Sequence, residues 1–215
     1  MFSISQKFVS MVFIIALSGC SSAYYSAMEK VGIHKRDIMV DRVLDAKESQ
    51  QEAQEQFKSA LAEMTALINF DGGELETQYN VIQEQYEDSK AAAERVSSRI
   101  DKIEDVADAL FEEWQDEIEL ISSSNLKRQS TSKLRDTQRL YGSLVKSMRK
   151  AESKMAPVLS ALQDNSLFLK HNLNAKAVGA LQGEMVSIKR DVSALIKDMN
   201  AAIEQSQKFI DMLEQ

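Results

Sequence analysis

The sequence has little of what interrupts a helix. One proline and seven glycines occur among 215 residues, and aromatic residues make up only 7%. Runs in which apolar and polar residues alternate, the pattern typical of half-buried strands, are also missing. Alanine, glutamate, glutamine, lysine, leucine and serine dominate instead, and most of these favour helices. The composition therefore predicts an all-α fold.

The motifs of common catalytic and metal sites are missing as well. Neither His34 nor His171 follows a glutamate at the spacing used in di-iron bundles. The sequence has no HExxH zinc motif, no glycine-rich phosphate loop and no GxSxG nucleophile motif. Packing explains four methionines at core positions better than copper binding does, namely Met148, Met155, Met185 and Met199. We therefore expect a protein that is not an enzyme and that has no cofactor and no metal site.

Basic residues are fewer than acidic ones, 26 against 33, and are unevenly distributed. The formal net charge is −7, so the basic surface that nucleic-acid binding requires is missing and no nucleic-acid partner is expected. Residues 71–121 hold sixteen acidic and four basic side chains, net −12, whereas residues 122–176 hold eleven basic and three acidic ones, net +8. If these two segments fold as a hairpin, an acidic helix lies beside a basic one, which helps to specify their pairing and register.

Apolar and small residues recur at spacings of three and four through almost the whole chain after residue 38. Breaks at "NFDGG" (69–73), "SSSN" (122–125) and "HNLN" (171–174) divide this pattern into four long helices. A seven-residue repeat sustained over several heptads indicates coiled-coil-like packing, and short turns make neighbouring helices antiparallel. We predict an elongated antiparallel four-helix bundle over residues 39–215, in which Pro157 kinks or breaks the third helix. The predicted core positions of the first helix are Met39, Val43, Ala46, Gln50, Ala53, Phe57, Ala60, Met64 and Leu67.

Trp114 lies within an acidic run, "FEEWQDEIE" at 111–119. Such a run is compatible with a site for a cation or for a partner. Trp114 also falls on a core position of the repeat, however, so we predict that its ring is in the core while the neighbouring carboxylates face solvent.

The N-terminus carries the pattern of a secretory signal peptide. A short segment with one positive charge, Met1–Lys7, precedes an uncharged run, Phe8–Leu17, that is too short to span a membrane. "LSGC" at 17–20 resembles the lipobox of bacterial lipoproteins, which implies cleavage after residue 19 and lipidation of Cys20, the only cysteine of the chain. The resemblance also implies an anchor on the periplasmic face of the outer membrane, because no aspartate follows the cysteine, although the inner membrane stays open. The alternative is an uncleaved N-terminal anchor with an incidental cysteine.

Residues 20–38 are predicted to form a short membrane-proximal segment. Tyrosine favours the membrane–water interface and basic side chains favour anionic headgroups, so candidate membrane contacts are Tyr24, Tyr25, Lys35 and Arg36. In the alternative interpretation the two tyrosines cap the end of the bundle and "HKR" at 34–36 is an exposed turn.

A second basic segment, "KRQSTSKLRDTQR" at 127–139, opens the third predicted helix. One hypothesis is a docking face for an anionic polymer or for headgroups, formed by Lys127, Arg128, Lys133, Arg135 and Arg139. The alternative is a solvated surface whose charges pair with the acidic helix beside it, and exposed pairs of this kind contribute little to stability.

The stretch "YYSAMEKVGIHKRDIMVDRV" followed by "DAKESQQEAQEQFKSAL" resembles a family of uncharacterised proteobacterial lipoproteins that is known only as a domain of unknown function. The resemblance implies an all-helical periplasmic lipoprotein and supplies no activity. We therefore expect a non-enzymatic envelope lipoprotein that acts as a scaffold, a spacer or a binding module for an envelope protein. The alternative is a chaperone-like bundle or one that sequesters a lipid or another ligand.

Overall fold

The computed structural model describes residues 20–68, 75–172 and 174–214. Within these residues the chain forms a short helix and four long ones: α2 (Cys20–Lys30), α3 (Lys35–Ile68), α4 (Leu75–Leu120), α5 (Ser124–His171) and α6 (Ala175–Leu213). No strand occurs in the described residues, so the predicted all-α fold is confirmed. The predicted signal peptide 1–19 and the "NFDGG" turn lie outside the described residues.

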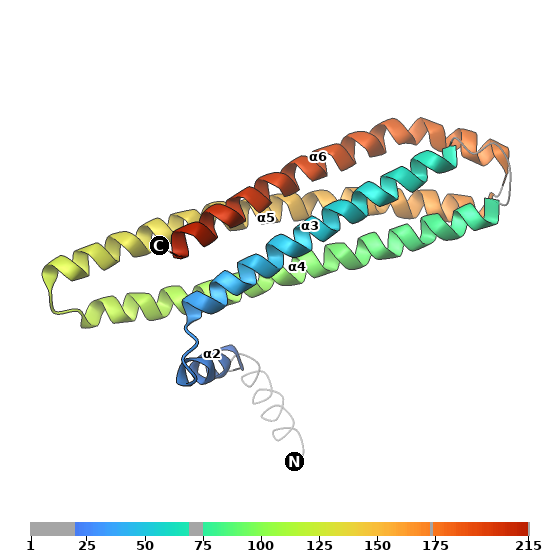
Figure 1. The fold of residues 1–215 in the computed structure, drawn as a ribbon. Coiled ribbons are helices and arrows are strands. Elements are labelled where there is room, and N and C mark those ends of the chain that lie inside the picture. Colours follow the sequence, from blue (N-terminus) through green and yellow to red (C-terminus); the bar gives the residue numbers. More distant parts are fainter. Residues whose placement is uncertain (1–19, 69–74, 173, 215) are drawn as a thin grey trace, which may run out of the picture.

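The four long helices run antiparallel in chain order and form an elongated bundle (Figure 1). Each packs against two others: α3 against α4 and α6, and α5 against α4 and α6. The helices differ in length, so α3 begins and α6 ends well short of the turn between α4 and α5, which projects past them (Figure 1). At that end the bundle is therefore reduced to a two-helix hairpin.

The core follows the heptad pattern. All nine core positions predicted for the first long helix are buried, including the polar Gln50. The core of α6 is likewise continuous from Val178 to Leu213. Apolar side chains that recur once per turn on one stripe pack against the facing helices, which explains why periodicity alone located the core.

Residues 20–38 contain a short helix of their own and the start of α3. The turn between the two helices uses Gly32, whose φ is +85°, a conformation that glycine adopts without the steric cost of a Cβ. The amide N–H of Gly32 donates to the carbonyl of Glu29 and that of Ile33 to the carbonyl of Met28, both at 3.0 Å. These bonds satisfy carbonyls at the end of α2 and reverse the chain, as is common at helix C-termini.

Pro157 does not break its helix, since α5 is continuous from Ser124 to His171. The proline side chain is exposed. A proline removes one backbone hydrogen bond, and on an exposed face water can solvate the carbonyl that loses its partner. The predicted turn at 122–125 is confirmed: Ser123 caps α5, and its Oγ accepts from the N–H of Leu126 at 3.4 Å.

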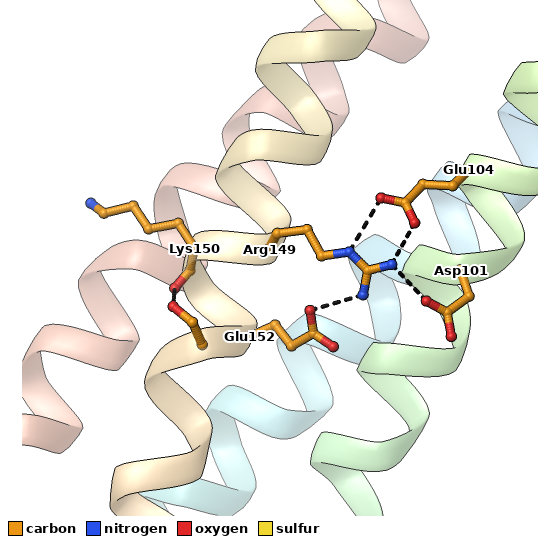
Figure 2. A network of polar contacts seen from close by, with 6 residues as sticks. Asp101, Glu104, Arg149, Lys150 and Glu152 are labelled. Carbon is orange, nitrogen blue, oxygen red and sulfur yellow. Dashed lines mark hydrogen bonds and ion pairs between the residues drawn. The ribbon is translucent and has the colours of Figure 1, made fainter.

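The predicted pairing of an acidic with a basic helix is seen between α4 and α5. Figure 2 shows Arg149 of α5 between Asp101 and Glu104 of α4, with Glu152 one turn further along α5. Its Nη2 lies 2.6 Å from an Asp101 carboxylate oxygen, and its Nη1 lies 2.9 Å from one of Glu152. The hydrogen bond to Glu104, above all, raises the pKa of Arg149, so this side chain stays charged.

Candidate functional site

A recess of about 430 Å³ opens where the bundle changes from four helices to two. The start of α3 and the end of α6 leave the inner face of the α4–α5 hairpin only partly covered, and Leu110, Trp114 and Leu213 form the apolar part of its wall. The rest of the wall is polar and includes charges of both signs. It is formed by Glu29, His34, Lys35, Arg36, Glu113, Glu117 and Lys133. We call this site the end recess.

A partly buried ion-pair cluster around Lys35 forms one side of the end recess. The side chain of Lys35 is only 11% exposed, and its Nζ lies 2.8 Å from Glu113 Oε1 of α4 while also bonding to Glu29 of α2. Burial lowers the pKa of Lys35, but the hydrogen bonds to Glu113 and Glu29 outweigh it, so the pKa is raised overall. Burial also raises the pKa of Glu113, whereas the hydrogen bond from Lys35 lowers that of Glu29. The cluster therefore ties α2, the start of α3 and α4 together.

A second contact fixes α2 to α4. Tyr25 is 4% exposed, and its hydroxyl donates to Asp105 Oδ2 at 2.5 Å. Burial, followed by this bond to a carboxylate, raises the pKa of the Tyr25 phenol, so the phenol remains a donor at neutral pH. Tyr24 packs edge-on against Tyr25, with ring centroids 5.3 Å apart, and is 43% exposed.

These contacts correct the predicted set of membrane contacts. Tyr25 is buried against α4, so for Tyr25 the structure favours the alternative in which it caps the bundle. Lys35 is only slightly exposed, and its ammonium group is held by Glu29 and Glu113 instead of being free for a lipid headgroup. Tyr24 and Arg36 remain exposed. The side chain of Cys20 lies outside the described side chains, although its backbone begins α2.

Trp114 is half-buried and lines the end recess instead of filling the core. Its Nε1–H donates to Ser130 Oγ at 2.9 Å, which joins α4 to α5. The prediction of a core position is wrong in this detail, because the ring lies at the end of the bundle, where α3 and α6 cover the α4–α5 hairpin only partly. The prediction that the neighbouring carboxylates face solvent is wrong for Glu113, which bonds to Lys35.

The five basic residues of the predicted docking face do not form one surface, because they lie on different sides of α5. Arg128 and Arg135 share a shallow exposed surface with Lys127, which pairs with Glu119 of α4 at 2.8 Å. Arg139 is exposed and pairs with Asp136 at 3.0 Å. Lys133 lies apart from these, on the wall of the end recess. The structure thus brings Lys133 together with Lys35 and Arg36, which the sequence had placed in separate segments.

Sequence reasoning missed Glu29 and Leu213 as parts of the end recess, and Asp105 as the partner of Tyr25. Asp105 and Glu113 lie 80 and 78 residues after their partners Tyr25 and Lys35, so no local spacing connects them. An acidic residue on an acidic helix gives no signal of its own. Leu213 was identified only as a core position, and it contributes to the wall because α6 ends there.

The side chains that line the end recess are of the kinds that bind a ligand by apolar and charged contacts. Within the described ranges no group of three or more His, Cys, Asp or Glu side chains is placed to hold a metal ion. None of the helices that the structure describes is long and apolar enough to span a bilayer. An apolar wall beside carboxylates and ammonium groups can accept an apolar side chain together with a polar or charged neighbour, as in a short segment of another protein.

Fold and site together define a class: an all-α antiparallel bundle with a docked N-terminal helix and an amphipathic recess at one end. The chain belongs to the family described as Protein of unknown function (DUF2959), whose model matches residues 24–213. The match covers most of α2 and all four long helices, and it confirms the resemblance to an uncharacterised family. Comparison with curated proteins and with solved structures gave no match.

Proposed function

We propose that this protein is a non-enzymatic, lipid-anchored adaptor of the cell envelope. In this proposal Cys20 carries the lipid at the periplasmic face of the outer membrane, and the bundle is a rod that presents the end recess to an envelope protein. The observation that carries the proposal is the docking of α2 on α4, because it makes the anchored end a fixed part of the rod.

The docking restricts how the rod sits at a membrane. Cys20 is five residues before Tyr25 on the same helix, which is about 7.5 Å at 1.5 Å per residue. Tyr25 is held on α4 by burial and by its bond to Asp105. A lipid on Cys20 would therefore hold the side of the bundle close to the bilayer, and the end recess, which Glu29 of the same helix helps to line, would lie near that surface.

The anchoring is tested by fractionation of cells that produce the full chain. Cys20→Ser is expected to move the protein from the membrane fraction to the soluble fraction, whereas Ser22→Ala, two residues away, is expected to leave it in the membrane. Retention of Cys20→Ser in the membrane fraction would refute the lipid anchor.

Partner binding is tested by crosslinking in the cell. A photoreactive amino acid at Glu117, on the exposed wall of the end recess, is expected to give a discrete adduct with one envelope protein. The same amino acid at Asp88, exposed on α4 outside the recess, is the matched control. Equal adducts at both positions, or none at Glu117, would exclude the recess as the partner site.

A further inference from the structure

A larger groove lies between α5 and α6. The segments that line it, 157–168 of α5 and 180–191 of α6, lie in the half of the rod away from the α4–α5 turn (Figure 1). Its volume is about 860 Å³. The groove exists because small side chains line the seam between the two helices, namely Ser160, Ala161, Ala180 and Ser187. Leu181 and Ile188, which are almost fully buried, contribute its apolar floor, and Phe168 is 40% exposed beside it.

Both walls of this groove are acidic. Asp164 of α5 and Glu184 and Asp191 of α6 line it, and among the side chains that the structure describes no lysine or arginine does. Asp191 pairs with Arg190 at 3.2 Å. Asp164 and Glu184 form no ion pair or side-chain hydrogen bond with another residue in the part of the chain that the structure describes. Two exposed carboxylates on opposite helices thus flank an apolar floor, and no described cationic side chain lies between them.

We propose that this groove binds a cationic amphipathic segment of a partner protein. Leucine-type side chains of the segment would contact Leu181, Ile188 and Phe168, and lysine or arginine side chains would pair with Asp164 and Glu184. The commitment to this ligand rests on complementarity of charge together with the apolar floor. A purely basic ligand would leave the floor unused, and a purely apolar one would desolvate the two carboxylates without pairing them.

A second copy of this chain is a poorer match. The basic surface on α5 consists of Lys127, Arg128 and Arg135 interspersed with Ser124, Thr131 and Ser132. That surface supplies positive charge but no apolar side chain for the groove floor. The groove differs from the end recess in its position and in its charge. Binding in the groove does not require a lipid on Cys20.

The test uses the full-length chain in nanodiscs of neutral lipid, with empty discs as the blank. The probe is a fluorescently labelled amphipathic helix built only of leucine and lysine, and binding is followed by anisotropy. Asp164→Asn/Glu184→Gln is expected to raise the Kd on the order of tenfold, because two opposite-charge contacts are lost. Ala180→Trp, which fills the groove from an exposed position, is expected to abolish binding.

The control is Glu84→Gln/Asp88→Asn. It removes the same charge from exposed positions on α4, outside the groove, and is expected to leave the Kd unchanged. Circular dichroism verifies that all variants remain helical.

Three results would overturn the proposal: an equal loss of affinity in the control, which would indicate non-specific charge attraction; equal binding of oligolysine with the same charge; or unchanged binding to Ala180→Trp. Self-association of the chain that Ala180→Trp abolishes would assign the groove to a second copy instead.

Discussion

Two glutamines one turn apart on α3 differ sharply in their surroundings. Gln54 donates to Asn200 Oδ1 at 2.9 Å and to the carbonyl of Ile196 at 3.4 Å. Gln50 is fully buried, and neither atom of its amide has a partner among the described residues. A buried polar group without a partner carries a desolvation cost with no compensating bond.

Exchanging these glutamines for leucine is expected to give opposite results. Gln50→Leu should raise the free energy of unfolding by about 1 kcal/mol, whereas Gln54→Leu should lower it by about 1 kcal/mol, because only the second change removes hydrogen bonds. Urea unfolding of residues 21–215, followed by circular dichroism, measures both. A loss of stability in Gln50→Leu would show that its amide has a partner, such as a bound water molecule.

Lys35 links α2 to α4 through its ion pairs with Glu29 and Glu113. Lys35→Met would leave the carboxylates of Glu29 and Glu113 facing each other without the cation, so we expect α2 to detach and the free energy of unfolding to fall by about 1–3 kcal/mol. Hydrogen exchange of the amides in 20–34 should become faster. Lys30→Met, an exposed lysine of α2 itself, is the control and should exchange at the original rate. Slow exchange in Lys35→Met would mean that the burial of Tyr25 alone holds α2.

The pairing of α4 with α5 combines a shared apolar seam with charges that cross between the two helices. Arg149 contacts two carboxylates of α4, whereas Arg139 contacts only Asp136 of its own helix. The side chain of Arg149 is 33% exposed and that of Arg139 is 76% exposed. A network at a partly buried position contributes more to stability than an exposed pair does.

Arg149→Met is therefore expected to lower the free energy of unfolding by about 1 kcal/mol, and Arg139→Met by less than about 0.3 kcal/mol. The effect of Arg149→Met should shrink in 1 M salt, because salt screens the charges that it removes. Urea titrations at low and high salt measure both quantities. Equal effects of the two substitutions would show that the network at Arg149 adds nothing beyond an exposed pair.

The whole molecule is a rod whose core is one seam of side chains along its length. For 215 residues, a compact globule has a radius of gyration of about 17 Å. α5 alone has 48 residues and is about 70 Å long. A rod of this length has a radius of gyration of about 20 Å or more. Small-angle X-ray scattering of residues 21–215 should give a value above 20 Å at concentrations where the chain is monomeric. A value near 17 Å would contradict the extended bundle.

Most of the fold could be predicted because its causes are local. The helix formers, the seven-residue repeat and the breaks in it determine where helices begin, end and present their apolar stripe. The positions of Met39, Phe57 and Phe209 in the core follow from that repeat alone. Segments with opposite net charge also predicted the neighbours α4 and α5. The helix in 20–30 was missed because its few residues show no sustained repeat, and its stability comes from packing on α4.

The sequence by itself determined the fold class, the order of the helices, the core stripe and the candidate lipid site at Cys20. Only the tertiary structure decided which charged residues meet. Lys35 pairs with a carboxylate 78 residues away, and Tyr25 with one 80 residues away. These contacts, and the end recess beside them, depend on how far each helix extends relative to its neighbours. Unequal helix lengths expose part of the hairpin and open the recess, and small residues facing each other across α5 and α6 open the groove. Neither the recess nor the groove follows from the seven-residue repeat, because each depends on how neighbouring helices are placed relative to one another.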